Sequence, residues 1–289
     1  MEGYESNFET ISNVNGAFYL PAFSFDGIGP LILGEAYQIY ASSDFTIEVD
    51  EGLNYDNLGN LNAGINWVAH SKSFMVPVEE AYAELSDLLY ISDSYGNTYQ
   101  PALGINDLKL LRPGLGYFVY LNEAYTDFVY PESISGYSCP SCTGCTEPLA
   151  LNFDAYATID DGTCSYSDLV TEVNSKALMH VTFLDSVFIN ADLPNEGWII
   201  SYYEDDSSVL QVGSAIEWTG EAATTTLWVD ENMTPNKDGF SIGETPTIIY
   251  QTSIGEYTIT EFTYPVSYDE MTIEFSPNNY FVVDSIEVE

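Results

Sequence analysis

The sequence predicts an all-β protein with one short helix, and three observations lead to that fold class. Apolar and polar residues alternate in short runs such as residues 45–49 and 271–275, a period of two that is typical of half-buried strands. Glycines such as Gly16 and Gly34 separate these runs, as expected of turns. Apolar residues make up 45% of the chain, which is enough for the strands to enclose a core.

Composition and charge narrow the class of protein. The chain has 289 residues, long enough for two or three domains. Forty-five acidic residues oppose five basic ones, and the net charge is −40. Such a surface excludes binding to nucleic acid or to an anionic membrane, because both require basic residues. No apolar run reaches the ~18 residues of a transmembrane segment, and the first ten residues carry no signal-peptide pattern.

An internal repeat organises the first half of the chain. Residues 6–50 align with residues 86–130 at a constant offset of 80 and without a gap. Identical pairs include Ile11 and Ile91, Gly16 and Gly96, Tyr19 and Tyr99, Pro21 and Pro101, Gly34 and Gly114, and Tyr37 and Tyr117. This self-similarity predicts two copies of one β-module.

The two copies differ in length. The second copy opens with a predicted strand at residues 65–74, around Trp67, and an amphipathic helix at residues 78–89. The helix would turn Ala81, Tyr82, Leu85, Leu88 and Leu89 toward a core. The first copy has neither element, so we interpret residues 1–51 as the tail of a truncated repeat, whose opening strand and helix lie upstream of Met1 or have been lost, and residues 52–135 as a complete repeat. We expect the truncated copy to expose apolar faces and not to form an independent domain.

Several segments of the second copy also carry a resemblance. The runs GINWVAHSKSFMVPVEEAYAEL, YGNTYQPALGIND, LRPGLGYFVYL and TDFVYP resemble a tandem module of secreted and surface proteins of Bacteroidetes, typically written GWNWIS, GxxYxP and LxPGxGY. Ile65 stands where that module usually has its first Trp. The resemblance implies a secreted or surface location and no particular reaction.

Residues 136–166 hold all four cysteines and form a predicted joint between the two halves. The run GCTEPLALNFDAYATIDDGTC resembles a disulfide module, GCTDPxAxNYxxxAxxDDGSC, found in surface proteins of marine Bacteroidetes and in virion proteins of marine phages and large algal viruses. That resemblance implies a Cys145–Cys164 disulfide, and closing such a loop removes ~3 kcal/mol of unfolded-chain entropy. Cys139 and Cys142 form either a CxxC bridge or a free, redox-labile pair. The alternative is a four-cysteine zinc site, for which the spacing is poor.

Two acidic loops suggest calcium, the one cofactor that the sequence offers. In the joint, Asn152, Asp154, Asp160 and Asp161 supply hard oxygen ligands. In the second half, Asp230, Asn232, Asp238 and Glu244 cluster around two glycines, together with Glu231. The alternatives are a solvated turn capped by Asp side chains in the joint and a hydrophilic hairpin in the second half, and the spacing in the joint does not fit an EF-hand.

Residues 167–289 predict a β-sandwich, because short strands recur there at the spacing of such folds. The runs GWIISYYEDD and VGSAIEWTGEAATTTLWVDENMTPNKDGFSIGE resemble another module of secreted Bacteroidetes proteins, in which GDWIG, WxG and WGDDxxTxxxDGFxxGE recur. In this chain Trp198 replaces a common Asp, and residues 229–231 replace Gly-Asp-Asp. We expect Trp218 and Trp228 to lie in the core and not to form a sugar platform.

No catalytic constellation is evident. His70 and His180 are the only imidazoles, and both lie in strand-like runs without a nucleophile motif nearby. The sequence therefore predicts a non-enzymatic extracellular surface protein for adhesion or scaffolding. Its partner would be a surface glycan, a protein ligand or further copies of itself. A virion fibre or decoration protein of a marine phage is the alternative, and a carbohydrate-binding or carbohydrate-active protein is the third hypothesis.

Overall fold

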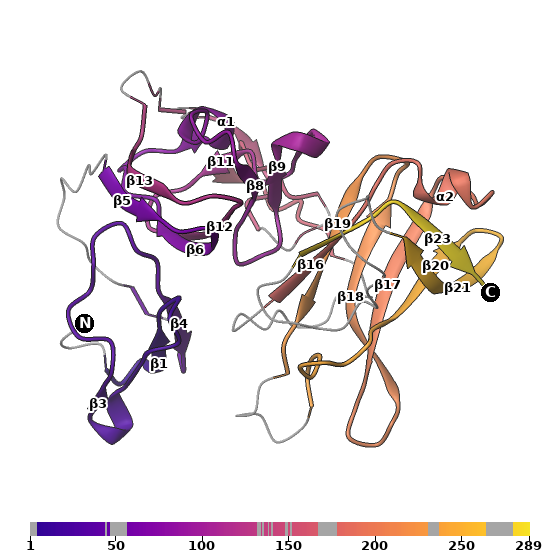
Figure 1. Cartoon of the computed structure of the whole chain (residues 1–289), viewed down its shortest axis with the longest axis horizontal. Coiled ribbons are helices and arrows are strands. Elements are labelled where there is room, and N and C mark those ends of the chain that lie inside the picture. The colour runs from indigo at the N-terminus through magenta and orange to yellow at the C-terminus, as the bar shows by residue number, and fades with distance from the viewer. Residues whose placement is uncertain are drawn as a thin grey trace. The chain divides into compact units, whose positions relative to one another are not determined.

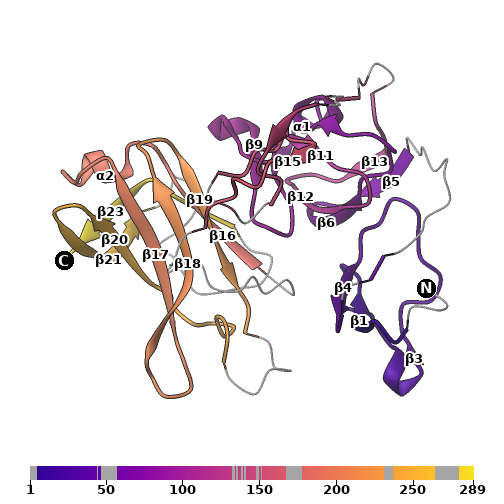
Figure 2. The same ribbon diagram turned by 180° about the vertical axis from the view of Figure 1, so that it is seen from behind.

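The computed structural model of the chain is built almost entirely from β-strands, which confirms the predicted fold class. It describes residues 5–43, 45–46, 57–131, 134, 136–137, 139, 141–147, 150, 152–166, 178–230, 237–263 and 280–289. The chain divides into two compact units, residues 1–165 and residues 166–289 (Figures 1 and 2). Each unit is described by itself below.

The first repeat copy forms a four-stranded sheet of order β3-β2-β1-β4, drawn in indigo in Figure 1. Its strands are β1 (Phe8–Ser12), β2 (Phe18–Leu20), β3 (Phe25–Asp26) and β4 (Gln38–Ala41), with a 3-10 turn at Pro21–Phe23.

The second copy forms a five-stranded sheet of order β10-β9-β8-β12-β6. Its strands are β6 (Gly64–Ala69), β8 (Leu88–Ser92), β9 (Thr98–Gln100), β10 (Ile105–Asn106) and β12 (Gly116–Leu121), with a 3-10 turn at Pro101–Leu103. Two short pairs flank this sheet: β7 (Val76–Pro77) with β11 (Leu110–Leu111), and β5 (Asn57–Leu61) with β13 (Tyr125–Val129).

The offset of 80 holds for strand pairing as well as for sequence. Ile11 pairs with Tyr19 and Ile39, and Ile91 pairs with Tyr99 and Val119. Each copy also has one register shift at an equivalent place. In the first copy it lies between Phe8 and Thr10 of β1. In the second copy it lies between Tyr120 and Leu121 of β12, which pair with the equivalent positions of β8. The four strands of the first copy therefore have the same order and register as β10-β9-β8-β12 of the second copy, which has β6 as an additional strand.

Two predicted boundaries were wrong. The helix expected at residues 78–89 is a single turn, α1 (Val78–Ala81), and the strand expected at residues 65–74 ends at Ala69. A helix this short is marginal without tertiary support, and Leu88 is instead paired with Leu121 in the sheet. Strand pairing therefore outcompeted helix propensity at the end of the predicted helix.

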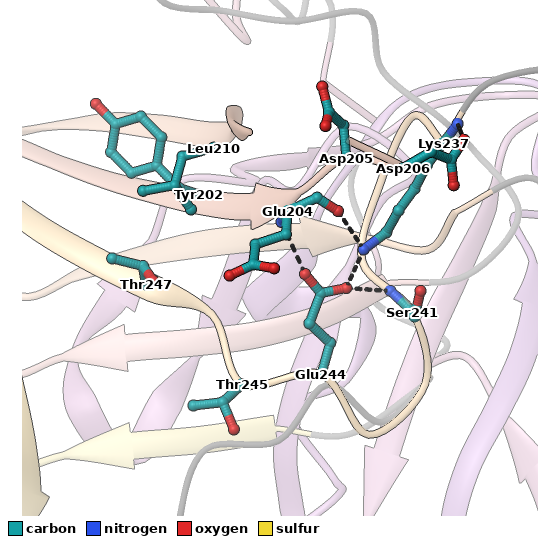
Figure 3. Close-up of a pocket in the computed structure, with 10 residues that line it drawn as sticks. All are labelled: Tyr202, Glu204, Asp205, Asp206, Leu210, Lys237, Ser241, Glu244, Thr245 and Thr247. Carbon is teal, nitrogen blue, oxygen red and sulfur yellow. Dashed lines mark hydrogen bonds and ion pairs between the residues drawn. The ribbon is translucent and has the colours of Figure 1, made fainter. Parts of the chain in front are cut away.

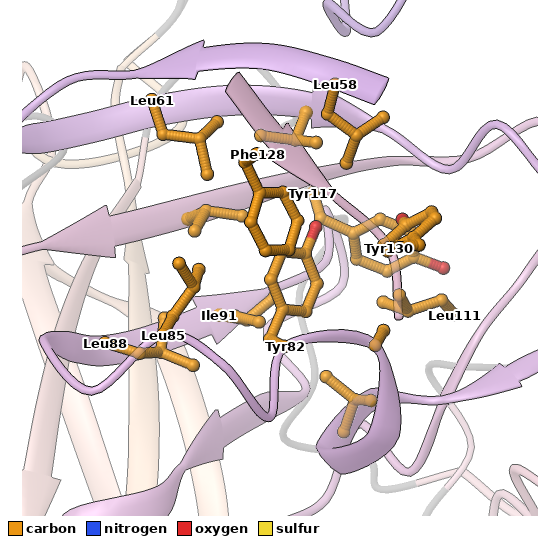
Figure 4. Close-up of a cluster of buried hydrophobic side chains, with 14 of the residues drawn as sticks. Leu58, Leu61, Tyr82, Leu85, Leu88, Ile91, Leu111, Tyr117, Phe128 and Tyr130 are labelled. Carbon is orange, nitrogen blue, oxygen red and sulfur yellow. The ribbon is translucent and has the colours of Figure 1, made fainter. Parts of the chain in front are cut away.

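The core of the second copy depends on the segment that the first copy lacks (Figure 4). Eight of its seventeen buried members lie in residues 57–87: Leu58, Leu61, Val68, Val76, Val78, Ala81, Tyr82 and Leu85. The ring of Tyr82 stacks on Phe128 at 5.4 Å between centroids. On β6 it is Val68 that enters this core, whereas Trp67 lies half-buried and meets the edge of Phe118 at 5.6 Å.

The joint follows the second copy within the first unit. Its strands β14 (Thr143–Gly144) and β15 (Ile159–Asp160) pair in parallel. The guanidinium of Arg112 donates to the carbonyl of Ala155 at 3.0 Å and lies 5.4 Å from the ring centroid of Phe153. The joint is thereby attached to the second copy through side-chain contacts as well as through the chain.

The second unit is a β-sandwich. One sheet has the order β19-β16-β22 and the other the order β18-β17-β20-β21-β23. The strands are β16 (Leu178–Phe183), β17 (Gly197–Glu204), β18 (Leu210–Trp218), β19 (Ala223–Trp228), β20 (Thr247–Thr252), β21 (Gly255–Thr263), β22 (Tyr280–Val283) and β23 (Ser285–Val288). A one-turn helix that the sequence did not predict, α2 (Val187–Asn190), follows β16.

Side chains from both sheets and from α2 meet in one core. The ring of Phe188 stacks on Tyr250 at 3.8 Å and meets the edge of Trp218 at 4.9 Å. Trp218 is fully buried and Trp228 is 7% exposed, which confirms that both are core residues. The predicted strand at residues 271–275 lies outside the described residues, as do residues 47–49 of the strand predicted at 45–49.

Candidate functional site

The cysteine-rich joint contains two disulfides. Cys145 is bonded to Cys164, as the resemblance implied, and Cys139 is bonded to Cys142. The four sulfurs are thus paired with one another, and the four-cysteine zinc alternative does not hold. The bridges stabilise a segment with little apolar content of its own, chiefly by restricting the unfolded chain.

Three of the four predicted oxygen ligands of the joint cap local turns, whereas Asn152 bonds to a residue thirteen positions further along the chain. Each accepts a backbone N–H: Asn152 from Ser165 (2.8 Å), Asp154 from Tyr156 (2.9 Å), Asp160 from Gly162 (3.1 Å) and Asp161 from Thr163 (2.9 Å). Such local bonds are what Asx turns provide. Within the part of the chain that the structure describes, no three His, Cys, Asp or Glu side chains are close enough to hold a metal ion. Calcium binding at the joint stays a prediction.

In the second unit, a lysine occupies the acidic loop for which the sequence suggested calcium (Figure 3). Lys237 Nζ lies 2.5 Å from Glu244 Oε2 and donates to the carbonyl of Glu204 at 2.6 Å. It also lies 5.5 Å from the ring centroid of Tyr203, within cation–π range. The ammonium group therefore supplies positive charge at the place where an ion was predicted.

Glu244 is held by several donors. Its carboxylate accepts the backbone N–H of Ser241 at 2.8 Å and that of Glu204 at 3.0 Å. Burial alone would raise the pKa of Glu244, but the bonds from Lys237 and from the two backbone groups outweigh it and lower the pKa below its ordinary value. The Glu244 carboxyl is consequently ionised at neutral pH.

The other predicted ligands of this loop are placed differently. Asp230 accepts the backbone N–H of Asp238 at 3.0 Å, an interaction that closes the loop itself. Asn232 and Glu231 lie outside the described residues. Among the predicted ligands that the structure describes, only Glu244 lines the adjoining cavity.

That cavity is the candidate ligand site of the second unit, with a volume of about 400 Å³. It lies at the ends of β17 and β20 and is lined by Tyr202, Glu204, Asp205, Asp206, Leu210, Lys237, Ser241, Glu244, Thr245 and Thr247 (Figure 3). Hydroxyls, carboxylates, one ammonium and one tyrosine provide donors and acceptors for a polar ligand.

Neither histidine lines this cavity. His70 is buried, with Nδ1 3.2 Å from the Tyr130 hydroxyl and Nε2 2.8 Å from the carbonyl of Phe74. Burial lowers the pKa of His70, and the bond to Phe74 offsets this only in part. Burial lowers the pKa of His180 to about 3. Both rings are therefore neutral core groups at physiological pH.

Sequence reasoning missed Lys237 as the centre of this loop. The available signal was its isolation, because it is one of only five basic residues in the chain and lies among acidic ones. A lone cation in such a setting is expected to bind the nearest carboxylates. The contacts from β17, which is distant in sequence, could not be read from local spacing.

Comparison of the chain with protein family models, with curated proteins and with solved structures finds no significant match. Among the described residues, no helix combines the length and the apolar character that crossing a bilayer requires. The functional assignment below therefore rests on chemistry and geometry.

Proposed function

We propose that this chain is a non-enzymatic extracellular surface protein that serves as an adhesion or scaffolding module. The observation that carries the proposal is the joint, in which two disulfides cross-link a short acidic segment beside a pair of β-repeats. Disulfides persist in oxidising compartments and are rare in the cytosol. The charge of −40 keeps such a surface protein soluble.

Two measurements test this proposal. Intact-mass analysis with and without reductant should show the mass gain of two reduced disulfides in protein taken from the native source. Labelling of intact source cells with a membrane-impermeant reagent should modify the protein. Free thiols in the native protein, or protection from the label until the cells are lysed, would contradict an extracellular location.

We further propose that the second unit is the adhesive one and takes a polar surface ligand, such as a glycan, in the cavity beside Lys237. Screening the full chain against a glycan array would identify the ligand class. Lys237→Met should abolish binding, because it removes the cavity's ammonium group. Lys109→Met, the same chemical change in the first unit, is the matched control. Equal ligand binding by the two variants would show that the ligand does not bind in this cavity.

A virion fibre or decoration protein remains the second candidate, because the first repeat copy leaves large apolar side chains exposed and an assembled particle could cover them. Mass spectrometry of purified particles from the source would test it. Recovery of the chain with capsid proteins would favour this candidate over a cell-surface protein.

A further inference from the structure

The two disulfides of the joint have different surroundings. Cys145 is 1% exposed, and the Sγ of its partner Cys164 lies 3.8 Å from Asp160 Oδ1. An attacking thiolate is therefore shielded from one sulfur and repelled at the other. Cys139 and Cys142 are both half-buried, and Cys139 lines a cavity of about 550 Å³ in the first unit. The Cys139–Cys142 bridge is thus the more accessible of the two.

This cavity differs in charge from the rest of the chain. The chain has 45 acidic residues against five basic ones, yet none of the described residues that line the cavity is acidic, and Arg112 is the one basic residue among them. The cavity beside Lys237, by contrast, is lined by four carboxylates. The walls around Arg112 are apolar or aromatic and comprise Phe74, Met75, Pro113, Tyr137 and Ile159. The cavity therefore suits a ligand with a negative charge on an apolar body.

Arg112 has donors left for such a ligand. A guanidinium group has five N–H donors. Among the described residues, the side chain of Arg112 makes one hydrogen bond, to the carbonyl of Ala155 at 3.0 Å. This bond and the contact with the ring of Phe153 hold the group at the joint. Its remaining N–H groups can bond to a carboxylate.

The backbone holds the two cysteines in place without the help of their sulfurs. Thr158 Oγ1 donates to the carbonyl of Cys139 at 2.6 Å, and the backbone N–H groups of Thr158 and Ile159 donate to the carbonyl of Cys142 at 2.9 and 3.0 Å. These bonds remain when the disulfide opens, so the sulfurs stay near each other and the bridge can close again. The bridge spans three residues, against nineteen for Cys145–Cys164, so its opening releases less unfolded-chain entropy.

We propose that the Cys139–Cys142 bridge is a thiol-exchange site, and that the cavity beside it takes a small thiol that carries a carboxylate. The carboxylate bonds to Arg112, and the thiol reaches the Sγ of Cys139. Arg112 also favours the thiolate form, which is the nucleophile in such exchange, and offsets the repulsion of an anion by a chain with a net charge of −40. This site lies in the first unit and does not depend on the proposed adhesive cavity.

The proposed reaction is balanced without an external oxidant or reductant. The thiolate of the ligand attacks the Sγ of Cys139, a new S–S bond forms, and the bond to Cys142 breaks. The electron pair of the broken bond leaves with Cys142, which becomes a thiolate and takes a proton from solvent. The hydroxyl of Tyr137 lies 3.7 Å from the Sγ of Cys142 and can donate to that thiolate. Attack by Cys142 on the new bond releases the ligand and restores the bridge.

The test uses the full chain and two matched thiols, β-mercaptopropionate and its uncharged methyl ester. After incubation with each thiol, acid stops the exchange, a maleimide labels the free thiols, and mass spectrometry of peptides locates both groups. We expect the added thiol on Cys139, the maleimide on Cys142 and an intact Cys145–Cys164 bridge. At equal concentrations the acid should give about three times as much adduct as the ester, an effect of the size that a partly exposed ion pair produces.

Variants of the basic residues test the role of charge. Arg112→Gln should abolish the preference for the acid and leave the amount of ester adduct unchanged. Arg112→Lys should retain a preference, because it keeps a cation in the cavity. Lys109→Gln is the matched control: it removes a cation that does not line the cavity and should leave the preference unchanged. Added NaCl should weaken the preference by screening the ion pair.

Three results would overturn the proposal. One is the absence of an adduct on Cys139, and another is an equal amount of adduct on Cys145 or Cys164. The third is the same ratio of acid to ester adduct in the parent chain and in Arg112→Gln. If Arg112→Gln also changes the amount of ester adduct, Arg112→Lys decides, and loss of the preference in that variant would overturn the recognition of the carboxylate. The exchange is measured on purified protein, so its outcome is independent of the surface labelling that tests the proposed function.

Discussion

The two repeat copies have the same strand register and different burial. The equivalent strands β1 and β8 pair with their neighbours at equivalent residues, as the pairs Ile11–Ile39 and Ile91–Val119 show. Ile39 is half-buried, whereas Val119 is fully buried. Four strands thus pair in the same order in both copies, whereas the segment at residues 57–87 adds the strand β6 and core side chains to the second copy alone.

Hydrogen bonds within each copy explain why the two copies have the same strand register. Asn13 Oδ1 accepts the backbone N–H groups of residues 15 and 17, and Asp93 Oδ1 accepts those of residues 95 and 97. The hydroxyl of Tyr37 accepts the N–H of Ile32 at 2.9 Å, and that of Tyr117 accepts the N–H of Arg112 at 2.7 Å. Each copy therefore encodes its own turns, while burial depends on a distant segment.

The largest expected difference between the copies concerns the equivalent residues Leu111 and Leu31. Leu111→Ala should destabilise the first unit by about 2–5 kcal/mol, because it leaves a cavity in a packed core. Leu31→Ala should change stability by less than about 0.5 kcal/mol, since the side chain is exposed. Urea unfolding, monitored by hydrogen exchange of the backbone amides in residues 88–92, would measure both changes in stability.

The two substitutions serve as controls for each other, because they remove the same side chain from equivalent positions of the two copies. Equal effects of the two substitutions would mean that the copies do not differ in coverage.

Much of this organisation could be predicted from sequence because its signals are local. The repeat, its turns and the core positions of Trp218 and Trp228 follow from spacing and side-chain type. The exposed apolar face was also expected, since the first copy lacks the strand and helix of the second. The strand that begins at Leu88 was not predicted, because it depends on pairing with Leu121, which is distant in sequence.

The candidate site was harder to predict from the sequence than the fold. Clustered carboxylates suggested calcium in both loops, but carboxylates also cap turns, and spacing does not separate the two uses. The joint illustrates the capping use at Asp154 and Asp161. In the second unit, the position of Lys237 depends on the carbonyl of Glu204, a contact between segments that are separated in the chain.

The next expected effect concerns the equivalent residues Ala36 and Gly116, which face each other. A Cβ at Gly116 would lie 2.5 Å from the Cβ of Ala36, closer than packed atoms tolerate. Gly116→Ala should therefore destabilise the first unit by about 1–3 kcal/mol through overpacking. Thermal unfolding of the full chain would measure the loss.

A compensating substitution makes this test specific. Adding Ala36→Gly to Gly116→Ala restores the number of Cβ atoms at the contact and should recover most of the lost stability. Failure to recover would show that Gly116 is needed for another reason than the approach of the first copy.

A smaller difference is expected for the paired tyrosines. Tyr117 is 2% exposed, whereas Tyr37 is half-buried. Tyr117→Phe should cost about 1–2 kcal/mol, because it leaves the N–H of Arg112 without its buried acceptor. Tyr37→Phe should cost less than about 1 kcal/mol, since water can reach the N–H of Ile32. Urea titrations of the two variants would compare them, and a larger loss for Tyr37→Phe would reverse the assignment of burial.

The smallest expected effect concerns the Asx turns, where Asp93 corresponds to Asn13. Burial raises the pKa of Asp93 although Asn97 and the backbone N–H groups of residues 95–97 bond to it and lower the pKa in part. Between the ordinary pKa and the raised one, the folded chain holds more protons than the unfolded chain. The second copy therefore loses stability as the pH rises through that window, and the loss is complete above the folded pKa.

Asp93→Asn should remove this loss. An amide oxygen can still accept the two backbone N–H groups, as Asn13 does at the equivalent turn. The variant should gain on the parent chain as the pH rises, reaching an advantage below about 1 kcal/mol near neutrality. Thermal unfolding between about pH 4 and pH 8 would measure the difference. Asn13→Asp, at a half-buried turn in the first copy, is the matched control and should show a weaker pH dependence. A difference between parent and Asp93→Asn that is constant across this range would show that burial does not set the proton affinity of Asp93.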